Sequence, residues 1–430
     1  MDTGGLATIR PPVDDDESSE RALMVGLAVG DRGRGRTESS LEELGLLARS
    51  AGATVVGRLV QERKRRDAAT LIGRGKVEDV ARASDASGAD LVLFDDELSP
   101  AQQRNIEKGV GRKTLDRTQL ILDIFARRAR SREGRLQVEL AQLDYLLPRL
   151  TGRGVVLSRL GGGIGTRGPG ETKLETDRRR IRQRIQSVRR EIDKVRRERR
   201  TRREARRRAD TPVVALVGYT NAGKSTLFTA LTREEAAASE QLFHTLDPLV
   251  RKASLGAGRD VLLVDTVGFI QKLPHALVAA FRATLEELVA ADLLLHVMDS
   301  SSEDLPEKEA AVEKVLDEVG AASRPRIVVL NKSDQLPDAQ TLALRAARPE
   351  AVLVSARTGE GLEALRAALA RHLDLVPRSV RLRFAASDGR GIAGVYTAGR
   401  VVAHQVLDDQ VEIEAEIPAR LVERFREHLV

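Results

Sequence analysis

The stretch TPVVALVGYTNAGKSTLFTAL at residues 211–231 decides the fold. It opens with an apolar run typical of a buried strand, continues with a glycine-bearing loop and ends in a helical segment. The loop fits the phosphate-binding pattern GxxxxGK[ST] in the strand–loop–helix context that this pattern requires. Glycines let backbone N–H groups curl around phosphates, which also lie at a helix N-terminus. The sequence therefore predicts a P-loop nucleotide-binding domain over 211–372.

Two segments supply the candidate phosphate and metal ligands. In the loop, Lys224 is expected to reach the β and γ phosphates, and the Ser225 hydroxyl to reach Mg²⁺. In VLLVDTVGF (261–269), Asp265 follows four apolar residues, and Gly268 lies where a backbone N–H can meet the γ-phosphate. The nucleotide ligands expected from the loop are Gly218, Tyr219, Thr220, Asn221, Ala222, Gly223, Lys224, Ser225 and Thr226.

The base preference is predicted by a third motif. After the apolar run 326–330 come Asn331, Lys332 and Asp334. A carboxylate can accept hydrogen bonds from N1–H and the exocyclic amine of guanine, whereas adenine does not offer that pair of donors. The run AVLVSARTGEG then places Ser355, Ala356 and Arg357 in a loop whose backbone N–H is expected at guanine O6. The alternative is a P-loop fold that binds ATP or no nucleotide.

The rest of the chain divides by pattern. We expect a disordered tail over 1–20, an α/β domain over 21–115, a helical hairpin over 116–208 and a small α+β domain over 378–430. In the first domain LIGRGKVEDV (71–80) resembles a phosphate loop, but a helix entry turn is the preferred interpretation. In the last, two or three strands precede a closing helix over 418–429, with Pro418 in its first turn.

The hairpin carries most of the positive charge. Residues 178–208 hold sixteen arginines and Lys194 against four acids, a net +13 in a chain whose formal charge is +7. Leucines from 136 to 150 and aliphatic residues from 174 to 195 repeat at steps of three and four, which predicts two antiparallel helices. A Gly-rich basic stretch at 151–173 joins them and is either a linker or a functional tip. The charge is either a solvated face or a surface for an anionic partner, and we favour the partner.

Composition excludes several classes of protein. The chain has no Cys, so disulfide modules, thiolate zinc sites, iron–sulfur clusters and Cys catalysis are ruled out. Its six His residues are scattered without metal-ligand spacing, and no window approaches the apolar length of a membrane span. The acidic first twenty residues differ from a signal peptide. We expect a cytoplasmic protein, and a monomer.

The motifs GYTNAGKS, DTVGF, NKSD and SAR resemble a translation-factor-related GTPase domain, and GGGIGTRGPGETKLETDRR (161–179) is similar to the signature that precedes this domain in the HflX family. The similarity extends over about 21–372. It implies a GTPase that binds GTP and GDP with Mg²⁺, associates with the large ribosomal subunit and its rRNA, and splits stalled or idle ribosomes. It also implies that FHTLDP (243–248) is the first switch, which makes Thr245 a candidate Mg²⁺ and γ-phosphate ligand.

Two residues condition the mechanism. Phe269 follows Gly268 where many GTPases place the Gln that orients water, so hydrolysis by the isolated protein should be slow unless a partner completes the site. Asn221 is similar to the Asn that holds K⁺ in cation-assisted relatives; alternatively it closes a loop hydrogen bond. One alternative function is an RNA-binding or assembly factor in which GTP gates binding. Another, a tRNA-modification GTPase, would be expected to use a cysteine, and none is present.

Overall fold

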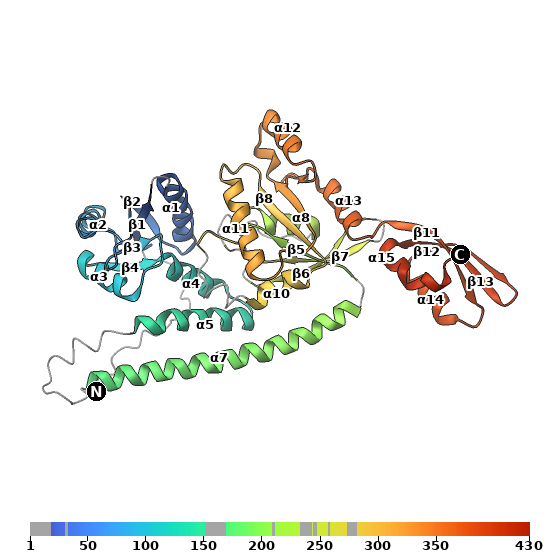
Figure 1. Ribbon diagram of the computed structural model, residues 1–430, viewed down its shortest axis with the longest axis horizontal. Helices are drawn as coiled ribbons and strands as arrows, with labels where there is room; N and C mark the ends of the chain where they lie inside the picture. Colours follow the sequence, from blue (N-terminus) through green and yellow to red (C-terminus); the bar gives the residue numbers. More distant parts are fainter. Residues whose placement is uncertain are drawn as a thin grey trace. The chain divides into compact units, whose positions relative to one another are not determined.

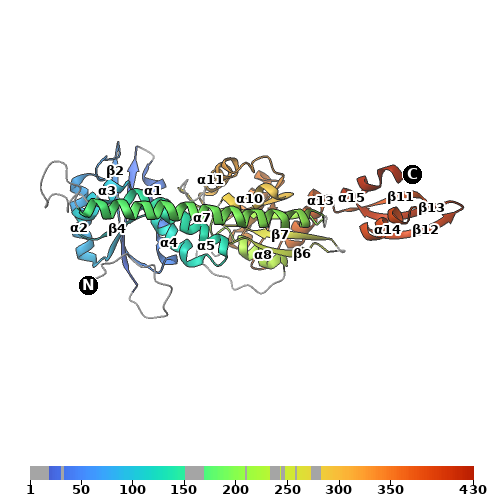
Figure 2. The same ribbon diagram turned by 90° about the horizontal axis from the view of Figure 1, so that it is seen from below.

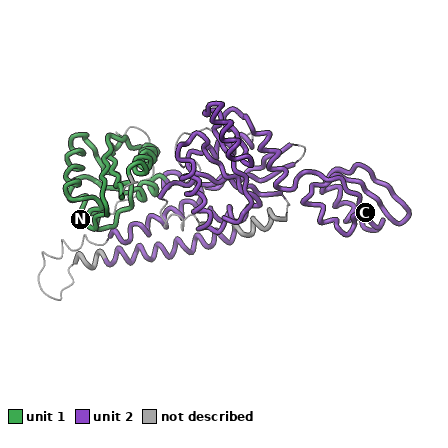
Figure 3. Tube along the Cα trace, turned by 45° about the horizontal axis from the view of Figure 1, so that its top comes forward, with its two compact units in different colours: residues 1–124 green, residues 125–430 purple. Residues whose placement is uncertain are grey.

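The computed structural model describes residues 19–30, 33–150, 169–208, 211–232, 243, 247–256, 259–272 and 282–430. Their strands form three sheets (Figure 1). The chain divides into two compact units, residues 1–124 and 125–430 (Figure 3). The multidomain α/β class predicted from the sequence, with a β-rich C-terminal domain, is confirmed.

The first unit is built on a four-stranded parallel sheet of order β2-β1-β3-β4. The strands are β1 (Arg21–Val29), β2 (Thr54–Arg63), β3 (Leu91–Phe94) and β4 (Lys113–Asp116). The helices are α1 (Gly33–Ser50), α2 (Arg74–Ser87), α3 (Pro100–Val110) and α4 (Arg117–Arg128), the last of which crosses the unit boundary. The sequence reading missed β4, because four residues with a single aliphatic side chain carry no measurable periodicity.

The phosphate-loop lookalike in the first unit is a helix entry. Helix α2 begins at Arg74 directly after Gly73, whose backbone N–H donates to the Gln61 side chain at 3.0 Å. Lys76, which could have served as a phosphate-binding lysine, forms an ion pair with Asp79 of the same helix at 3.7 Å. The stretch 71–80 is therefore a turn that leads into a helix, as the sequence predicts.

The second unit contains a six-stranded sheet of order β10-β9-β8-β5-β7-β6. The strands are β5 (Val213–Val217), β6 (Leu249–Ser254), β7 (Asp260–Asp265), β8 (Leu293–Asp299), β9 (Arg326–Asn331) and β10 (Val352–Leu353). All neighbours are parallel except β6, which runs antiparallel to β7. Because their carboxyl ends meet at one edge, residues that follow β5, β7, β8 and β9 are brought together there.

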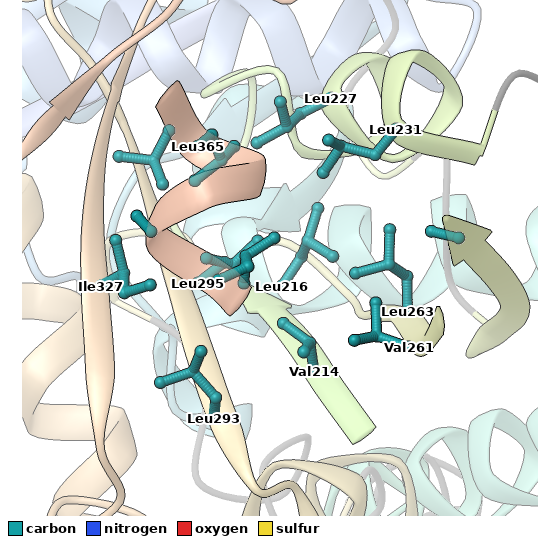
Figure 4. Packing of buried hydrophobic residues seen from close by; sticks show 14 of the residues in the cluster. Val214, Leu216, Leu227, Leu231, Val261, Leu263, Leu293, Leu295, Ile327 and Leu365 are labelled. Atoms are coloured by element: carbon teal, nitrogen blue, oxygen red, sulfur yellow. The ribbon is translucent and has the colours of Figure 1, made fainter. Parts of the chain in front are cut away.

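Apolar packing fixes the helices on this sheet. Leu227 and Leu231 of α8 (Lys224–Thr232) and Leu365 of α13 (Leu362–His372) belong to one buried cluster with alternate residues of β5 and β8 (Figure 4). The cluster omits the intervening strand residues, which leaves the opposite face to α10 (Arg282–Ala290) and α11 (Leu305–Glu318). Helix α8 is thereby held with its first turn against the end of β5.

The hairpin consists of α5 (Arg132–Arg149) and the 40-residue helix α7 (Pro169–Arg208), which lie side by side and antiparallel (Figures 1 and 2). Leu136 packs with Val188 and Ile192, as the leucine repeat predicts. A bidentate ion pair, with atoms 2.6 and 2.8 Å apart, joins Arg184 of α7 to Glu139 of α5. Most of the predicted tip lies outside the described residues.

The C-terminal sheet has order β11-β13-β12 and is antiparallel. Its elements are β11 (Pro377–Ala385), α14 (Gly389–Ala398), β12 (Arg400–Leu407), β13 (Gln410–Pro418), α15 (Ala419–Val422) and the 3₁₀ helix η2 (Glu423–His428). The expected single closing helix is wrong: one α turn passes into 3₁₀ geometry. Pro418 ends β13 in an extended conformation and precedes the helix, because it pairs with Pro377 in the ladder. In the described part of the chain no helix is both long and apolar enough to cross a membrane.

Candidate nucleotide-binding site

The loop between β5 and α8 depends on two close backbone approaches. A Cβ atom at Gly218 would lie 2.1 Å from the carbonyl oxygen of Val297 in β8. Gly223 has a φ of +86°, and a Cβ atom there would lie 2.2 Å from Nδ2 of Asn331. Glycine alone fits both positions, so the two fixed glycines of the motif let the loop fold tightly against β8 and β9.

Lys224 is the first residue of α8 and is buried, with only 6% of its surface exposed. Its Nζ donates to the backbone carbonyl of Tyr219 at 2.8 Å, so the side chain folds back over the loop. Burial lowers the pKa of Lys224 to about 8, although the nearby Asp265 carboxylate acts in the opposite direction. Additional negative charge beside the loop would therefore stabilise the charged form of Lys224.

Ser225 and Asp265 present oxygen ligands at the same place. The Ser225 hydroxyl donates to Oδ2 of Asp265 at 2.8 Å, and Asp265 is fully buried at the end of β7. Among the described residues, no group of three or more His, Cys, Asp or Glu could hold a metal. A hydroxyl beside a carboxylate nevertheless suits Mg²⁺, which keeps several waters and takes few protein ligands beside substrate phosphates.

The segment after β7 is tied to the loop by two backbone hydrogen bonds. The Thr220 N–H donates to the Phe269 carbonyl at 2.7 Å, and the Phe269 N–H donates to the Gly218 carbonyl at 3.1 Å. A Cβ atom at Gly268 would lie 2.8 Å from Nζ of Lys224, so the two predicted γ-phosphate contacts are neighbours. The Phe269 ring is 1% exposed and therefore packs in the interior.

Asn331, the last residue of β9, joins the phosphate loop to the loop at 355–357. Its Nδ2 donates to the Ala222 carbonyl at 2.9 Å, and its Oδ1 accepts from the Ala356 N–H at 3.0 Å. The side chain is 2% exposed, so both of its polar atoms act as internal cross-links. Asn331 therefore holds the phosphate loop and the 355–357 loop in a fixed relation.

Asp334 is the middle residue of the 3₁₀ turn η1 (Ser333–Gln335) and contacts the loop Ser355–Ala356–Arg357. One of its oxygens accepts from the Ser355 hydroxyl at 2.7 Å, and the other lies 2.8 Å from the guanidinium of Arg357. The Arg357 side chain is 75% exposed and that of Asp334 only 10%, so Arg357 reaches from the surface to a largely buried carboxylate. The carboxylate predicted to read guanine is thus positioned by Ser355.

The described structure brings the predicted site residues to one sheet edge, with one exception. Thr226 lies in the first turn of α8, and Asn221 adopts the left-handed conformation, φ 61°, that Asn tolerates. Thr245 lies outside the described residues. Sequence reasoning missed Asp299, whose Oδ2 lies 2.6 Å from Nζ of Lys332, although its place at the end of an apolar strand was a usable signal.

Family models and curated relatives match most of this chain. Family models described as GTP-binding GTPase N-terminal, GTP-binding GTPase Middle Region and 50S ribosome-binding GTPase match residues 38–126, 128–206 and 213–332. The GTPase HflX of Caldanaerobacter subterraneus is 46% identical over 96% of this chain and 94% of its own length. The GTPase HflX of Escherichia coli is 44% identical over 88% of this chain and 89% of its own.

A solved structure of a protein named SsGBP in complex with GDP is similar at 26% identity and a TM-score of 0.47, over 82% of this chain and 98% of that one. The curated relatives carry the assignment, because they are more than 40% identical over most of both chains. The chain is therefore a GTP-binding protein and a GTPase, and it belongs to the HflX family.

Proposed function

We propose that this chain hydrolyses GTP at the carboxyl edge of the six-stranded sheet and uses the hydrolysis cycle to act on the large ribosomal subunit. The backbone of 218–223 and Lys224 would bind the phosphates. Asp334, with Asn331 and the loop Ser355–Ala356–Arg357 as its support, would recognise guanine. Ser225 would hold Mg²⁺, and by family resemblance Thr245 would join it.

The residues of the chain prepare the phosphate transfer chiefly by position and charge. Mg²⁺, when bound, would neutralise charge on the phosphate oxygens. The phosphates would stabilise the charged form of the buried Lys224 side chain, and the Gly268 N–H would donate a hydrogen bond to the γ-phosphate. Because the buried Phe269 ring cannot orient water, turnover by the isolated protein should be slow. A partner would complete the site.

The observation that carries the ribosomal proposal is helix α7. It is a 40-residue helix whose stretch 178–208 has a net charge of +13, and four residues of sequence separate its last residue from the start of the GTPase family match at residue 213. Four acids cannot balance seventeen cations by i,i+4 pairing, so an anionic partner explains the excess better than a solvated face. The match to a model described as a 50S ribosome-binding GTPase supports the large subunit and its rRNA as that partner.

Co-sedimentation tests this proposal. The full-length protein is pelleted with ribosomes in GTP, GDP and a non-hydrolysable analogue, and subunit profiles are recorded for each state. Binding to large subunits with GTP or the analogue, together with loss of 70S particles, supports splitting. Binding to isolated precursors of the subunit without loss of 70S would instead favour an assembly factor in which GTP gates binding.

One deletion and one exchange of ions refine the test. Removing 161–170 should leave GTP affinity intact, because no proposed phosphate or guanine ligand lies there, and should abolish splitting. If the deletion variant splits ribosomes as well as wild type, the stretch is only a linker. Exchanging Na⁺ for K⁺ in the hydrolysis assay tests whether Asn221 helps to hold K⁺; equal rates would leave K⁺ without a role.

A further inference from the structure

A single carboxylate links the start of helix α5 to the chain that leads into β6. Oδ2 of Asp247 accepts hydrogen bonds from the backbone N–H groups of Arg130, at 3.0 Å, and Ser131, at 2.7 Å. Its other oxygen accepts from the Ser131 hydroxyl. Hydrogen bonds to an ionised acceptor are the stronger kind, and here three converge on one side chain. Asp247 therefore supplements the N-cap of the hairpin's first helix.

The place is shaped for this carboxylate. Ser131 is the N-cap of α5, and its side chain accepts from the Gly134 N–H at 2.9 Å while donating to Asp247. A Cβ atom at Gly134 would lie 2.3 Å from Oδ1 of Asp247, so any larger residue would push the carboxylate away. Glycine is otherwise unfavourable inside a helix, which indicates that the close approach is the reason for it.

A second contact attaches the same part of the chain. The ring of Phe243, 4% exposed, packs edge-on against Phe125 of α4 with centroids 4.6 Å apart and an interplanar angle of 79°. Phe243 thus packs on α4, and Asp247 binds the connection between α4 and α5. Asp247 lies two residues before β6, whose first residue, Leu249, pairs with Asp265 in the β6–β7 ladder.

These contacts form a continuous route between the hairpin and the nucleotide site. It runs from the N-terminus of α5 through Asp247 and β6 to Asp265, which accepts the hydrogen bond of Ser225. Every step is a hydrogen bond, a ladder pair or a short covalent connection between described residues. A network of this kind can carry coupling between two sites if it has two arrangements that both sites favour differently.

We propose that Asp247 is a positioning residue that couples the nucleotide state of the P-loop domain to the first turn of α5, and hence to the hairpin. The inference rests on the proposed function of that domain as the GTP site. Coupling between two sites is reciprocal. If a partner that binds the hairpin changes the affinity for a nucleotide by some factor, that nucleotide changes the affinity for the partner by the same factor.

Hydrogen exchange on the full-length protein tests the coupling. The exchange rates of the amides of residues 130–134 are measured with GDP and with a non-hydrolysable GTP analogue. We expect at least about a threefold difference between the two states in wild type. Asp247→Ala should raise the rates in both states by about tenfold or more, since charged hydrogen bonds are lost, and should abolish the difference.

Further variants separate coupling from simple capping. Gly134→Ala raises the intrinsic helix propensity but displaces the Asp247 carboxylate. It should therefore have the same effects on the exchange rates as Asp247→Ala. Asp247→Asn keeps an acceptor for both backbone N–H groups and should give an intermediate result. If Asp247→Ala proves unfolded by circular dichroism, these two carry the test.

A matched control exists in the C-terminal domain. Asp388 caps α14 by accepting from the Gly391 N–H at 2.9 Å, and a Cβ atom at Gly391 would lie 2.4 Å from its carboxylate. Asp388→Ala should accelerate exchange around residue 391 and leave the difference at 130–134 unchanged. The coupling would be overturned if the difference in exchange rate between the two nucleotide states persisted in Asp247→Ala. It would also be overturned if wild type bound both nucleotides and showed no such difference. Failure of wild type to bind guanine nucleotides would refute the proposed site instead.

Discussion

At the scale of single residues, Asp334 is the proposed ligand of the guanine base. Its two oxygens face Ser355 and Arg357, and guanine would replace the exposed Arg357 as a donor. Asp334→Asn turns a double acceptor into a group that is half donor, so GTP affinity should fall by about 2 to 4 kcal/mol. Xanthosine triphosphate, with a carbonyl in place of the amine, should gain affinity. Equal GTP affinity in titration calorimetry of the variant and wild type would exclude Asp334 as the guanine ligand.

Lys224 makes nucleotide binding dependent on pH. Its pKa is lowered to about 8 by burial, and phosphates would raise that pKa, so binding should take up a proton. Uptake should be about half a proton at pH 8 and fall toward zero below pH 7, where Lys224 is already charged. Calorimetry in buffers of different ionisation enthalpy measures the uptake. The nucleotide's terminal phosphate is already ionised at pH 8 and adds little; a buffer-independent enthalpy at pH 8 would contradict the assignment.

His296 is a buried titratable group outside the site. Burial lowers its pKa from 6.5 to about 4, and no described residue hydrogen-bonds its Nδ1. Because the unfolded chain binds the proton more tightly, His296 favours folding above pH 6.5, and this contribution is lost as the pH falls toward 4. The loss should reach about 3 kcal/mol over that range. In urea titrations, His296→Leu should lose less stability on acidification; parallel curves for the two proteins would disprove this.

At the scale of elements, local motifs were predicted well and long-range contacts were not. The phosphate loop and the guanine motif each follow an apolar strand, so their sequence already contains their structural context. Strands β4 and β6 escaped detection because they are short and partly polar. The bond between Ser131 and Asp247 joins residues 116 positions apart, and nothing in the pattern of either segment specifies the other.

Helix α7 should make binding to RNA strongly dependent on salt. If about six phosphates are neutralised, affinity for ribosomes should fall by roughly three orders of magnitude between 50 and 200 mM salt. Charge reversal within 199–208 should weaken binding and flatten this slope, whereas GTP affinity should not change. Glu139→Gln is the control: it loosens the ion pair with Arg184 in the hairpin but leaves the charge of +13 in 178–208 unchanged. A salt-independent affinity would argue against phosphate contacts.

At the scale of the whole molecule, the two units have separate cores. The sheet of the first unit and the six-stranded sheet share no strand, and every proposed nucleotide ligand belongs to the second unit. Calorimetric unfolding should therefore show at least two transitions, of which GDP shifts only one. At a GDP concentration one hundred times its Kd the gain is about 2.7 kcal/mol. If one transition shifts as a whole, the units unfold together and the division is only geometric.

The uninterrupted length of α7 has a mechanical consequence. At 1.5 Å per residue, its 40 residues span about 60 Å, and its last residue lies five positions before β5. A rod of that length that turns by about 5° at the end near β5 sweeps its far end through about 5 Å. A small turn at the end near β5 would thus become a movement at the far end about as large as a nucleotide base is wide.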